Sequence, residues 1–266
     1  MDHLTNAAHA ESSSQQNPTL HNVPPVDDNE DLIVDDQEVS TNYLQHNMFL
    51  LMFGNKLGSA PPNEKGTKVG RILDLGTGSG IWAMEFGDEH PEAEVLGIDL
   101  SATWPNYNLN AGGYLELNEF DIIPRSDDGT PREDSAMLKS SRMIKEAAAI
   151  FGGPFRDVVG LADLMRGIGF GDVYIKRSRW PTNAWPKDPR HKELGLWNNE
   201  NITSGWEGFC MAPFTRALNW TREEVLLLMD QVRHEFNDKS IHAYFNVWSI
   251  HGRKPTAEVM GFGDGN

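Results

Sequence analysis

The sequence predicts an α/β fold with a Rossmann-like sheet, and three observations at its centre indicate this class. A short apolar segment at 71–75 runs directly into a glycine-rich turn at 76–80. A helical segment follows at 81–89, and a second short apolar segment follows at 94–98. A strand, a crossover helix and a second strand in this order form a right-handed unit whose strands are parallel.

The composition of the first 38 residues predicts a disordered acidic tail. They are rich in Asn, Gln, Ser, Pro and acidic residues, and a segment with so few large apolar side chains cannot offset its ordering entropy. Residues 1–55 contain no Lys or Arg, although the whole chain has 23 of them against 39 Asp and Glu. We therefore expect two parts, a tail at 1–38 and a folded domain at 39–266.

The rest of the domain is expected to add helices and a final antiparallel strand. A helix begins near Ser40 and ends near Gly54 or Gly58, and Thr221 with Glu224 gives a capping-box signature for a helix to about 236. The other expected elements are a strand at 114–120, helices at 134–151 and 158–167, a strand at 172–179, a loop at 180–189 and a closing strand at 243–251.

Composition narrows the class of function and the compartment. A formal net charge of −16 argues against direct nucleic-acid binding, which needs a basic face. The longest apolar run, 48–53, is far shorter than the roughly 20 residues of a membrane span. Cys210 is the only cysteine, so no intrachain disulfide forms and a reducing compartment is expected. We expect a cytoplasmic protein, with the nucleus as the alternative.

The glycine-rich turn carries the chemistry. Gly76, Gly78 and Gly80 allow positive φ angles and let a ligand lie against the backbone. The helix that follows offers free N–H groups to a carboxylate or a phosphate. Asp99 ends the second strand, where a carboxylate can accept both hydroxyls of a ribose.

Three ligand classes compete for such a turn. A phosphate-binding P-loop needs Lys and Ser or Thr after its last glycine, whereas this chain has Ile81-Trp82. A dinucleotide fingerprint needs a third glycine where Ile81 stands. S-adenosylmethionine has a ribose and a carboxylate but no phosphate, and Asp74 can hold its ammonium group, through water. The residues favour this ligand, and a nicotinamide cofactor remains the alternative.

With these motifs the chain resembles the fungal LaeA-like (UMTA-type) class I S-adenosylmethionine-dependent methyltransferases. The resemblance covers nearly everything after residue 38. It rests on Gln45-His46, ILDLGTGSGIWAMEF at 72–86, EVLGIDLS at 94–101, AGGYLELNEFD at 111–121, RSDDGTPREDS at 125–135, WPKDP at 185–189 and SIHAYFNVWSIHGRKP at 240–255.

The resemblance implies a cofactor site and a class of reaction. The cofactor-binding residues it indicates are Asp74, Gly76, Thr77, Gly78, Gly80 and Asp99. The implied reaction is methyl transfer to a small-molecule acceptor in secondary metabolism. The alternative is a catalytically weak relative that acts as a regulatory or interaction protein with a protein partner. Methyl transfer from a sulfonium depends mainly on positioning, so the sequence identifies no catalytic residue.

One stretch departs from the family pattern. Only eleven residues, 101–111, separate Leu100 from Gly112, where the class I sheet places two further strands with their helices. Each strand-plus-helix unit takes roughly 20 residues, so about 40 are absent. We expect an incomplete sheet in which the strand at 114–120 either pairs directly with the strand at 71–75 or leaves both with unpaired backbone.

Several weaker signals have a plain structural alternative. The resemblance places His46 close to the cofactor, although packing or capping is the favoured reading of a helical histidine. His242 and His251 are expected to be packed or surface residues, and the nine histidines show no metal-ligand spacing. Glu119 either approaches the transferred methyl group or forms a salt bridge. The tryptophans Trp180, Trp185, Trp197 and Trp206 either line an apolar pocket or pack in the core.

Removal of the tail tests the proposed domain boundary. Because residues 1–38 lack the apolar side chains needed for a core, a chain that starts at Val39 should melt within a few degrees of the full chain. Thermal melts of the two proteins, followed by circular dichroism, make the comparison. A large drop in melting temperature would mean that the tail packs on the domain.

Overall fold

The computed structural model describes residues 36–98 and 109–256, with side chains described from Tyr43 onward. The described residues belong to one compact unit. The predicted tail, apart from residues 36–38, and the predicted ribose ligand Asp99 lie outside the described residues.

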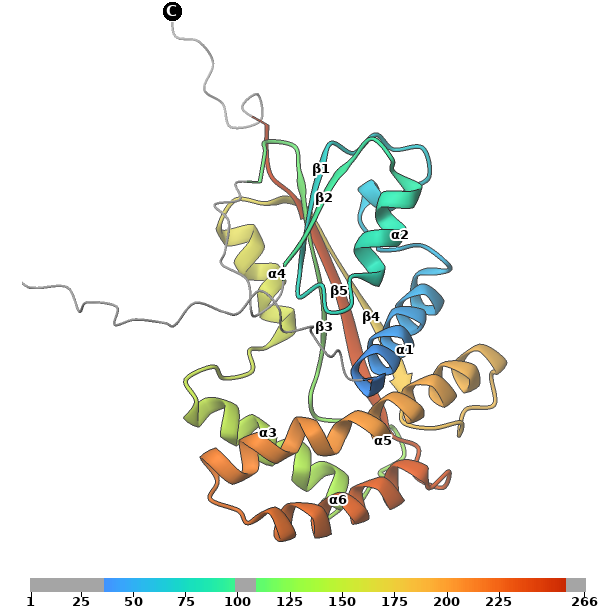
Figure 1. Cartoon of the computed structure of the whole chain (residues 1–266), viewed down its shortest axis with the longest axis vertical. Helices are drawn as coiled ribbons and strands as arrows, with labels where there is room; N and C mark the ends of the chain where they lie inside the picture. Colours follow the sequence, from blue (N-terminus) through green and yellow to red (C-terminus); the bar gives the residue numbers. More distant parts are fainter. Residues whose placement is uncertain (1–35, 99–108, 257–266) are drawn as a thin grey trace, which may run out of the picture. The chain divides into compact units, whose positions relative to one another are not determined.

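The described chain alternates strands and helices before it ends in a helical region and a long strand (Figure 1). In chain order the elements are α1 (Asp36–Phe53), the short 3-10 helix η1 (Pro61–Asn63), β1 (Arg71–Leu75), α2 (Ile81–Glu89), β2 (Glu94–Ile98), β3 (Tyr114–Phe120), α3 (Ala136–Ile150), α4 (Val158–Gly167), β4 (Gly171–Pro181), α5 (Pro189–Ala217), α6 (Arg222–Asn237) and β5 (Tyr244–Arg253).

The strands form two sheets, which confirms the α/β class. β1 and β2 pair in parallel, from Arg71 opposite Glu94 to Leu75 opposite Ile98. The second sheet is antiparallel, with the strand order β3-β5-β4. Among the described strands none pairs with the other side of β1, so β3 does not take the place of a central strand. Of the two outcomes expected for the short 101–111 segment, direct pairing of β3 with β1 is therefore wrong.

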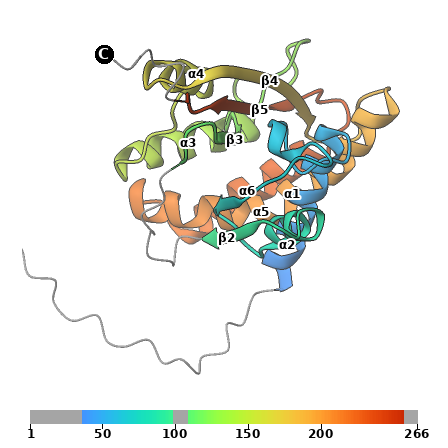
Figure 2. The same ribbon diagram turned by 90° about the horizontal axis from the view of Figure 1, so that it is seen from above.

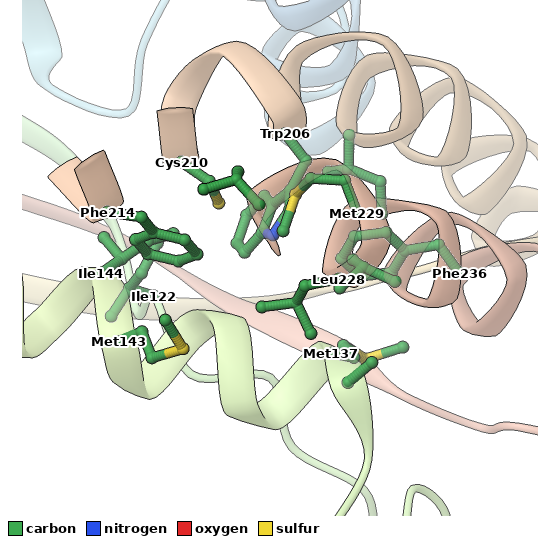
Figure 3. Packing of buried hydrophobic residues seen from close by; sticks show 14 of the residues in the cluster. Ile122, Met137, Met143, Ile144, Trp206, Cys210, Phe214, Leu228, Met229 and Phe236 are labelled. Carbon is green, nitrogen blue, oxygen red and sulfur yellow. The ribbon is translucent and has the colours of Figure 1, made fainter. Parts of the chain in front are cut away.

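The main core lies at one end of the antiparallel sheet, where α3, α5 and α6 pack together (Figures 1 and 3). Trp206 contacts the rings of Phe236 and Phe245, at centroid distances of 5.5 and 5.9 Å, so it links α5, α6 and β5. Cys210 is fully buried in this core, and burial raises the pKa of its thiol to about 12. A thiol of this kind is unreactive.

Helices cover both faces of the antiparallel sheet (Figure 2). On one face, α4 packs on Ile250 of β5 through Val158, Ala162 and Met165. On the other face, Met48 of α1 belongs to a cluster with buried residues of β4, β5 and α5. Trp180 is buried in that cluster, and Trp206 is buried in the main core. The tryptophans on β4 and α5 therefore pack in the core, as one of the two readings of these residues expects.

The parallel sheet is covered less completely. Phe86 of α2 is buried with Leu57 and Val69, and Ile72 and Val95 pack against them from β1 and β2. Other apolar side chains of these strands stay open to solvent. Leu75 is 52% exposed and Leu96 is 36% exposed. Since parallel sheets are normally covered on both faces, β1 and β2 lack part of their usual surroundings.

A carboxylate of β3 holds the loop between α1 and β1 against the antiparallel sheet. Glu116 accepts hydrogen bonds from the backbone N–H groups of Ser59 and Ala60, at 2.7 and 2.9 Å. The Ser59 hydroxyl is 3.0 Å from the same carboxylate, 2.6 Å from the Ser249 hydroxyl and 3.0 Å from Nδ1 of His251. This polar cluster, which we call the Glu116 clamp, joins residues 57–63 to β3 and β5.

Most predicted elements are confirmed, and one long helix was not anticipated. The bounds predicted for β1, α2, β2, β3 and α4 match the structure, whereas β4 extends beyond the strand expected at 172–179 to Pro181. Helix α5 covers 29 residues that the sequence left without an element. Its buried residues are spread around the helix because it contacts α1, α3, α6 and β4. No single apolar stripe therefore identifies it.

Loss of the Glu116 clamp should destabilise the fold. Glu116→Ala leaves two backbone N–H groups without their acceptor, which costs about 2–3 kcal/mol, or roughly 5–10 °C in melting temperature. Glu119→Ala on the same strand is the matched control and should change the melting temperature by little. Equal melting temperatures for Glu116→Ala and the control would show that residues 57–63 do not depend on the clamp.

Candidate functional site

The loop between β1 and α2 is built from glycines in the left-handed conformation. Gly76, Gly78 and Gly80 have φ angles of 78°, 52° and 77°. Residues with a side chain adopt such angles at a cost of about 1 kcal/mol or more, so the local backbone requires these glycines. Gly76 and Gly78 are also exposed, and a Cβ atom placed on Gly76 or Gly80 would meet nothing within 4 Å. The loop therefore presents open backbone to a ligand.

Backbone hydrogen bonds fix this loop to the end of β2. The N–H groups of Gly76 and Thr77 both donate to the carbonyl of Ile98, at 2.8 and 3.1 Å. The N–H of Gly80 donates to the carbonyl of Thr77 at 2.9 Å and closes the turn. The chain consequently leaves β2 directly beside the glycine loop. The residue after Ile98 is the predicted ribose ligand Asp99, which lies outside the described part of the chain.

A contact between Thr77 and Gly97 was missed by the sequence reasoning. A Cβ atom on Gly97 would lie 2.6 Å from Oγ1 of Thr77, so β2 needs a glycine where the loop crosses it. The signal was present, because a glycine inside a buried strand often marks close approach of another backbone. Oγ1 of Thr77 is buried and has no hydrogen-bond partner among the described residues. A buried hydroxyl of this kind is usually satisfied by water or by a ligand.

The start of α2 is suited to an anionic group. Gly80 is the N-cap, no side chain caps the helix, and its first turn contains no acidic residue. The N-terminal N–H groups of a helix and its dipole together favour a carboxylate or phosphate. Asp74, half-buried in β1 opposite Gly97, supplies a carboxylate one strand position before Leu75. The loop thus offers donors on one side and an acceptor on the other.

Of the predicted cofactor residues, the structure brings five together at one turn, namely Asp74, Gly76, Thr77, Gly78 and Gly80. Their arrangement fits a ligand that lies along the loop backbone and carries both a carboxylate and an amine. Within the described ranges, no group of three or more His, Cys, Asp or Glu side chains is arranged to hold a metal ion. No described helix is both long and apolar enough to cross a membrane.

His46 lies next to the helix that follows the glycine loop. It is buried in α1, and its Nε2 is 2.9 Å from Oε2 of Glu85 on α2. Glu85 is the fifth residue of α2, so this hydrogen bond ties α1 to the second turn after the loop. His46 therefore has a structural role, as expected of a helical histidine, because it is hydrogen-bonded to Glu85. A direct contact of His46 with a ligand stays a prediction.

The remaining candidates lie on the antiparallel sheet. Glu119 of β3 lies opposite Trp248 of β5 and is in contact with solvent. It takes part in none of the ion pairs of the described chain. Partial desolvation raises its pKa. His251 belongs to the Glu116 clamp, and burial lowers its pKa while the nearby Glu116 opposes that change. His242 is half-exposed and is hydrogen-bonded to Asp128.

Curated fungal proteins are similar to this chain over most of its length. The probable methyltransferase tdiE of Emericella nidulans is 27% identical, over 84% of this chain and 83% of the relative. The methyltransferase pytC of Aspergillus terreus is 30% identical, over 79% and 78%. The secondary metabolism regulator LAE1 of Cochliobolus heterostrophus is 28% identical, over 83% and 88%. No family model matches the chain.

The same alignments contain many positions at which this chain has no residue. The alignment with tdiE runs over 267 positions, yet it covers only 84% of a chain of 266 residues. Roughly 40 positions of the alignment are therefore absent here, which is the length of about two strand-plus-helix units. This length agrees with the segment that the sequence pattern indicates as missing beside residues 101–111.

Two solved structures are similar at low identity. A SAM-dependent methyltransferase from Thiobacillus denitrificans, in complex with S-adenosyl-L-homocysteine, aligns with 78% of this chain and 98% of its own at 11% identity and a TM-score of 0.33. YjhP from E. coli aligns with 77% of this chain and 96% of its own at 14% identity and a TM-score of 0.34.

Restoring a segment of relative-like length should stabilise the protein. We expect a variant in which the corresponding segment of the Aspergillus terreus relative replaces residues 101–111 to melt several degrees higher. The added strand would cover side chains such as Leu75 and Phe120, now 52% and 39% exposed. Covering each contributes about 1 kcal/mol. Urea and thermal unfolding give the comparison.

A Gly/Ser segment of equal length is the control for this experiment. It adds loop entropy without a strand, so it should leave the protein no more stable than the original chain. If the relative's segment and the Gly/Ser segment have the same effect, the two-sheet arrangement does not lack a strand.

Proposed function

The chain belongs to the fungal methyltransferase family that includes the LaeA-type regulators of secondary metabolism, and from that premise we propose that it transfers a methyl group from S-adenosylmethionine to a small molecule. The observation that carries the proposal is the β1–glycine loop–α2–β2 unit. Three left-handed glycines leave its backbone open where the chain passes from strand to helix.

The residues of this unit suit the parts of S-adenosylmethionine. Gly76, Gly78 and Gly80 let the ligand lie against the loop, and the uncapped start of α2 attracts its carboxylate. We propose that Asp74 holds the ammonium group through water. The buried hydroxyl of Thr77 is a polar group for a ligand or its water to satisfy. Asp99, next after β2, would accept the ribose hydroxyls.

When bound, the cofactor supplies an activated methyl group on a sulfonium. The protein then has to hold the acceptor in line with that methyl group and exclude water, and positioning of this kind lowers barriers by up to about 7–11 kcal/mol. A single polar loop and a rigid acceptor site are sufficient for such chemistry. We propose a small-molecule acceptor of secondary metabolism as the substrate.

The alternative function is a catalytically weak regulatory or interaction protein with a protein partner. The short segment at 101–111 favours it, since the family pattern places a central strand and its helix there. The intact loop favours the enzyme. Cofactor affinity separates the two readings, because a regulatory protein without a complete pocket would bind S-adenosylmethionine weakly or not at all.

We also propose a reducing compartment, the cytoplasm or the nucleus. The support is the cysteine content, since Cys210 is the only cysteine of the chain and it is buried as a free thiol.

Loss of the proposed ribose ligand tests the cofactor site. Calorimetry with S-adenosylmethionine should show that Asp99→Ala weakens binding by about 1.5–3 kcal/mol, roughly 10- to 150-fold, because one charged hydrogen-bond acceptor is lost. Asp88→Ala, an exposed change on α2, should leave the affinity unchanged. Equal affinities for Asp99→Ala and the original chain would contradict the role given to Asp99.

A further inference from the structure

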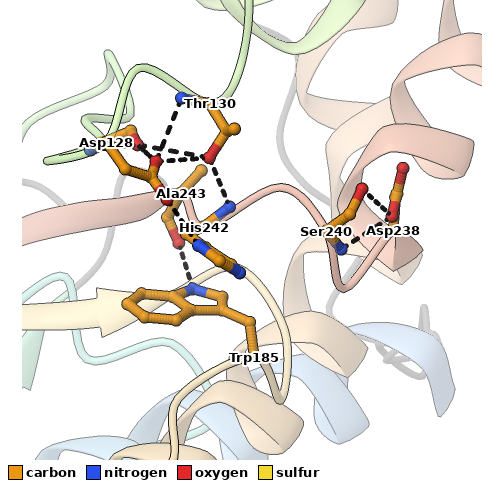
Figure 4. Close-up of polar contacts among 8 residues, drawn as sticks. Asp128, Thr130, Trp185, Asp238, Ser240, His242 and Ala243 are labelled. Atoms are coloured by element: carbon orange, nitrogen blue, oxygen red, sulfur yellow. Dashed lines mark hydrogen bonds and ion pairs between the residues drawn. The ribbon is translucent and has the colours of Figure 1, made fainter.

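Three sequence blocks that carry the family resemblance have no part in the glycine loop, yet they meet at one place in the fold. They lie at 125–135, after β3, at 185–189, before α5, and at 240–255, which contains β5. Asp128, Trp185 and His242 represent the three blocks, and Figure 4 shows these side chains together with Thr130. The cluster is therefore assembled only by the tertiary structure.

Asp128 is held as an ionised acceptor. Its Oδ1 accepts hydrogen bonds from the hydroxyls of Ser126 and Thr130, both at 2.6 Å, and from the backbone N–H of Thr130 at 3.1 Å. These donors, together with His242, hold the pKa of the Asp128 carboxyl well below its usual range. The other oxygen, Oδ2, lies 2.6 Å from Nδ1 of His242. Because an ionised carboxylate only accepts, Nδ1 carries the proton.

This hydrogen bond decides the chemistry of the other ring nitrogen. In a neutral imidazole with its proton on Nδ1, Nε2 is a proton acceptor. No residue of the described chain is hydrogen-bonded to Nε2, and the side chain of His242 is 43% exposed. Asp127, the neighbour of Asp128 in the chain, is paired with Arg179 at 2.6 Å. Nε2 is thus an accessible base.

The imidazole is also fixed in position. The Trp185 ring packs against it at a centroid distance of 4.9 Å and an angle of 32°. Trp185 is held in turn, because its Nε1 donates to the carbonyl of Ala243 at 2.9 Å. The backbone N–H of His242 donates to the hydroxyl of Thr130 at 2.9 Å. An oriented imidazole with a carboxylate on Nδ1 is the arrangement that serine hydrolases use for their general base.

A groove for a small molecule lies beside the pair. It has a volume of about 440 Å³, and its lining residues are Thr130, Pro131, Arg132, Asp134, Ser135, Glu235, Ser240 and Ile241. This volume falls in the range of small-molecule sites, about 300–1,000 Å³. Thr130 lines the groove and is bonded to both Asp128 and His242. Thr130 therefore belongs both to the lining of the groove and to the hydrogen-bond network of the pair.

The pair of Asp128 and His242 lies near the start of β5, at one end of the antiparallel sheet. Contacts of α1 link this end of the sheet to the helix that follows the glycine loop. One turn of α1 makes both links: His46 bonds to Glu85, early in α2, and Phe49 packs edge-on against Trp180 at 5.0 Å. Trp180 is opposite Phe245, three residues after His242. Helix α2, which begins at the loop, and the end of β4, which pairs with the start of β5, thus contact the same segment of α1.

We propose that His242, oriented by Asp128, is the general base for the methyl acceptor and that the adjoining groove binds an acceptor with a phenolic hydroxyl. The proposal rests on the proposed methyl transfer. The acceptor hydroxyl gives its proton to Nε2 as its oxygen bonds to the methyl carbon. The electron pair of the broken carbon–sulfur bond stays on sulfur, which becomes the neutral thioether of S-adenosylhomocysteine. The imidazolium then releases its proton to water.

A general base at His242 and a purely structural role of His242 predict different kinetics. We expect His242→Gln to keep its melting temperature and its affinity for S-adenosylmethionine, but to lose roughly 100-fold or more in kcat toward para-methoxyphenol, a weakly acidic phenol. The loss should be much smaller toward para-nitrophenol, which is largely ionised without help.

Two further variants sharpen the test. Asp128→Asn should lower the same rate, because an amide no longer enforces the proton on Nδ1. His191→Gln is the matched control, since His191 also bonds to a carboxylate, Asp188 at 2.7 Å, but lies exposed in the first turn of α5, where Asp188 is the N-cap. Equal losses toward both phenols, or a loss shared by His191→Gln, would overturn the base role.

A binding measurement separates this inference from the proposed function. NMR of the histidine ring nitrogens in the full chain, without cofactor, should show Nδ1 of His242 protonated and should show the Nε2 signal shift when para-nitrophenol is added. Phenol binding without an effect on His242 overturns the acceptor site even if the protein is an active methyltransferase. A chain that binds no S-adenosylmethionine and methylates neither phenol contradicts the proposed function and, with it, the base role, whatever the NMR shows.

Discussion

Residues 99–113 are the only chain between the end of β2 and the start of β3, and this short distance constrains the rest of the structure. Each parallel crossover needs a dozen or more residues, usually with a helix. Fifteen residues leave no room for two such units, and β1 and β3 belong to different sheets of the described structure. The glycine loop therefore belongs to a two-stranded parallel unit, and no described strand continues its hydrogen-bond ladder into the antiparallel sheet.

Side chains make the connection that a central strand would otherwise make. The Glu116 clamp holds residues 57–63 to the antiparallel sheet, while Nε1 of Trp82 on α2 donates to the carbonyl of Leu57 at 2.7 Å. Helix α1 adds the hydrogen bond between His46 and Glu85 and the contact of Phe49 with Trp180. These contacts are directional, so they position the two sheets, but they cover less apolar surface than a strand with its helix.

The proposed cofactor site and the proposed acceptor site belong to different sheets. The parallel unit provides the proposed cofactor loop, and none of the described strands adds a wall on the other side of β1. The antiparallel sheet provides the pair of Asp128 and His242 and the groove next to it. Because methyl transfer depends on how well acceptor and cofactor are aligned, the proposed reaction requires the contacts of α1 to hold the two sheets in place.

The sequence alone determined the β1–loop–α2–β2 unit, because a strand that ends in three glycines and a helix is defined by residues adjacent in the chain. The bounds of β1, α2, β2 and β3 follow from the same local signals. Helix α5 was missed because several partners bury different sides of it, which removes the periodic pattern. Only the tertiary structure brought Asp128 to His242 and Glu116 to Ser59. These partners are separated by 114 and 57 positions, and a contact at that distance depends on strand pairing and helix packing, which no spacing of residues reveals.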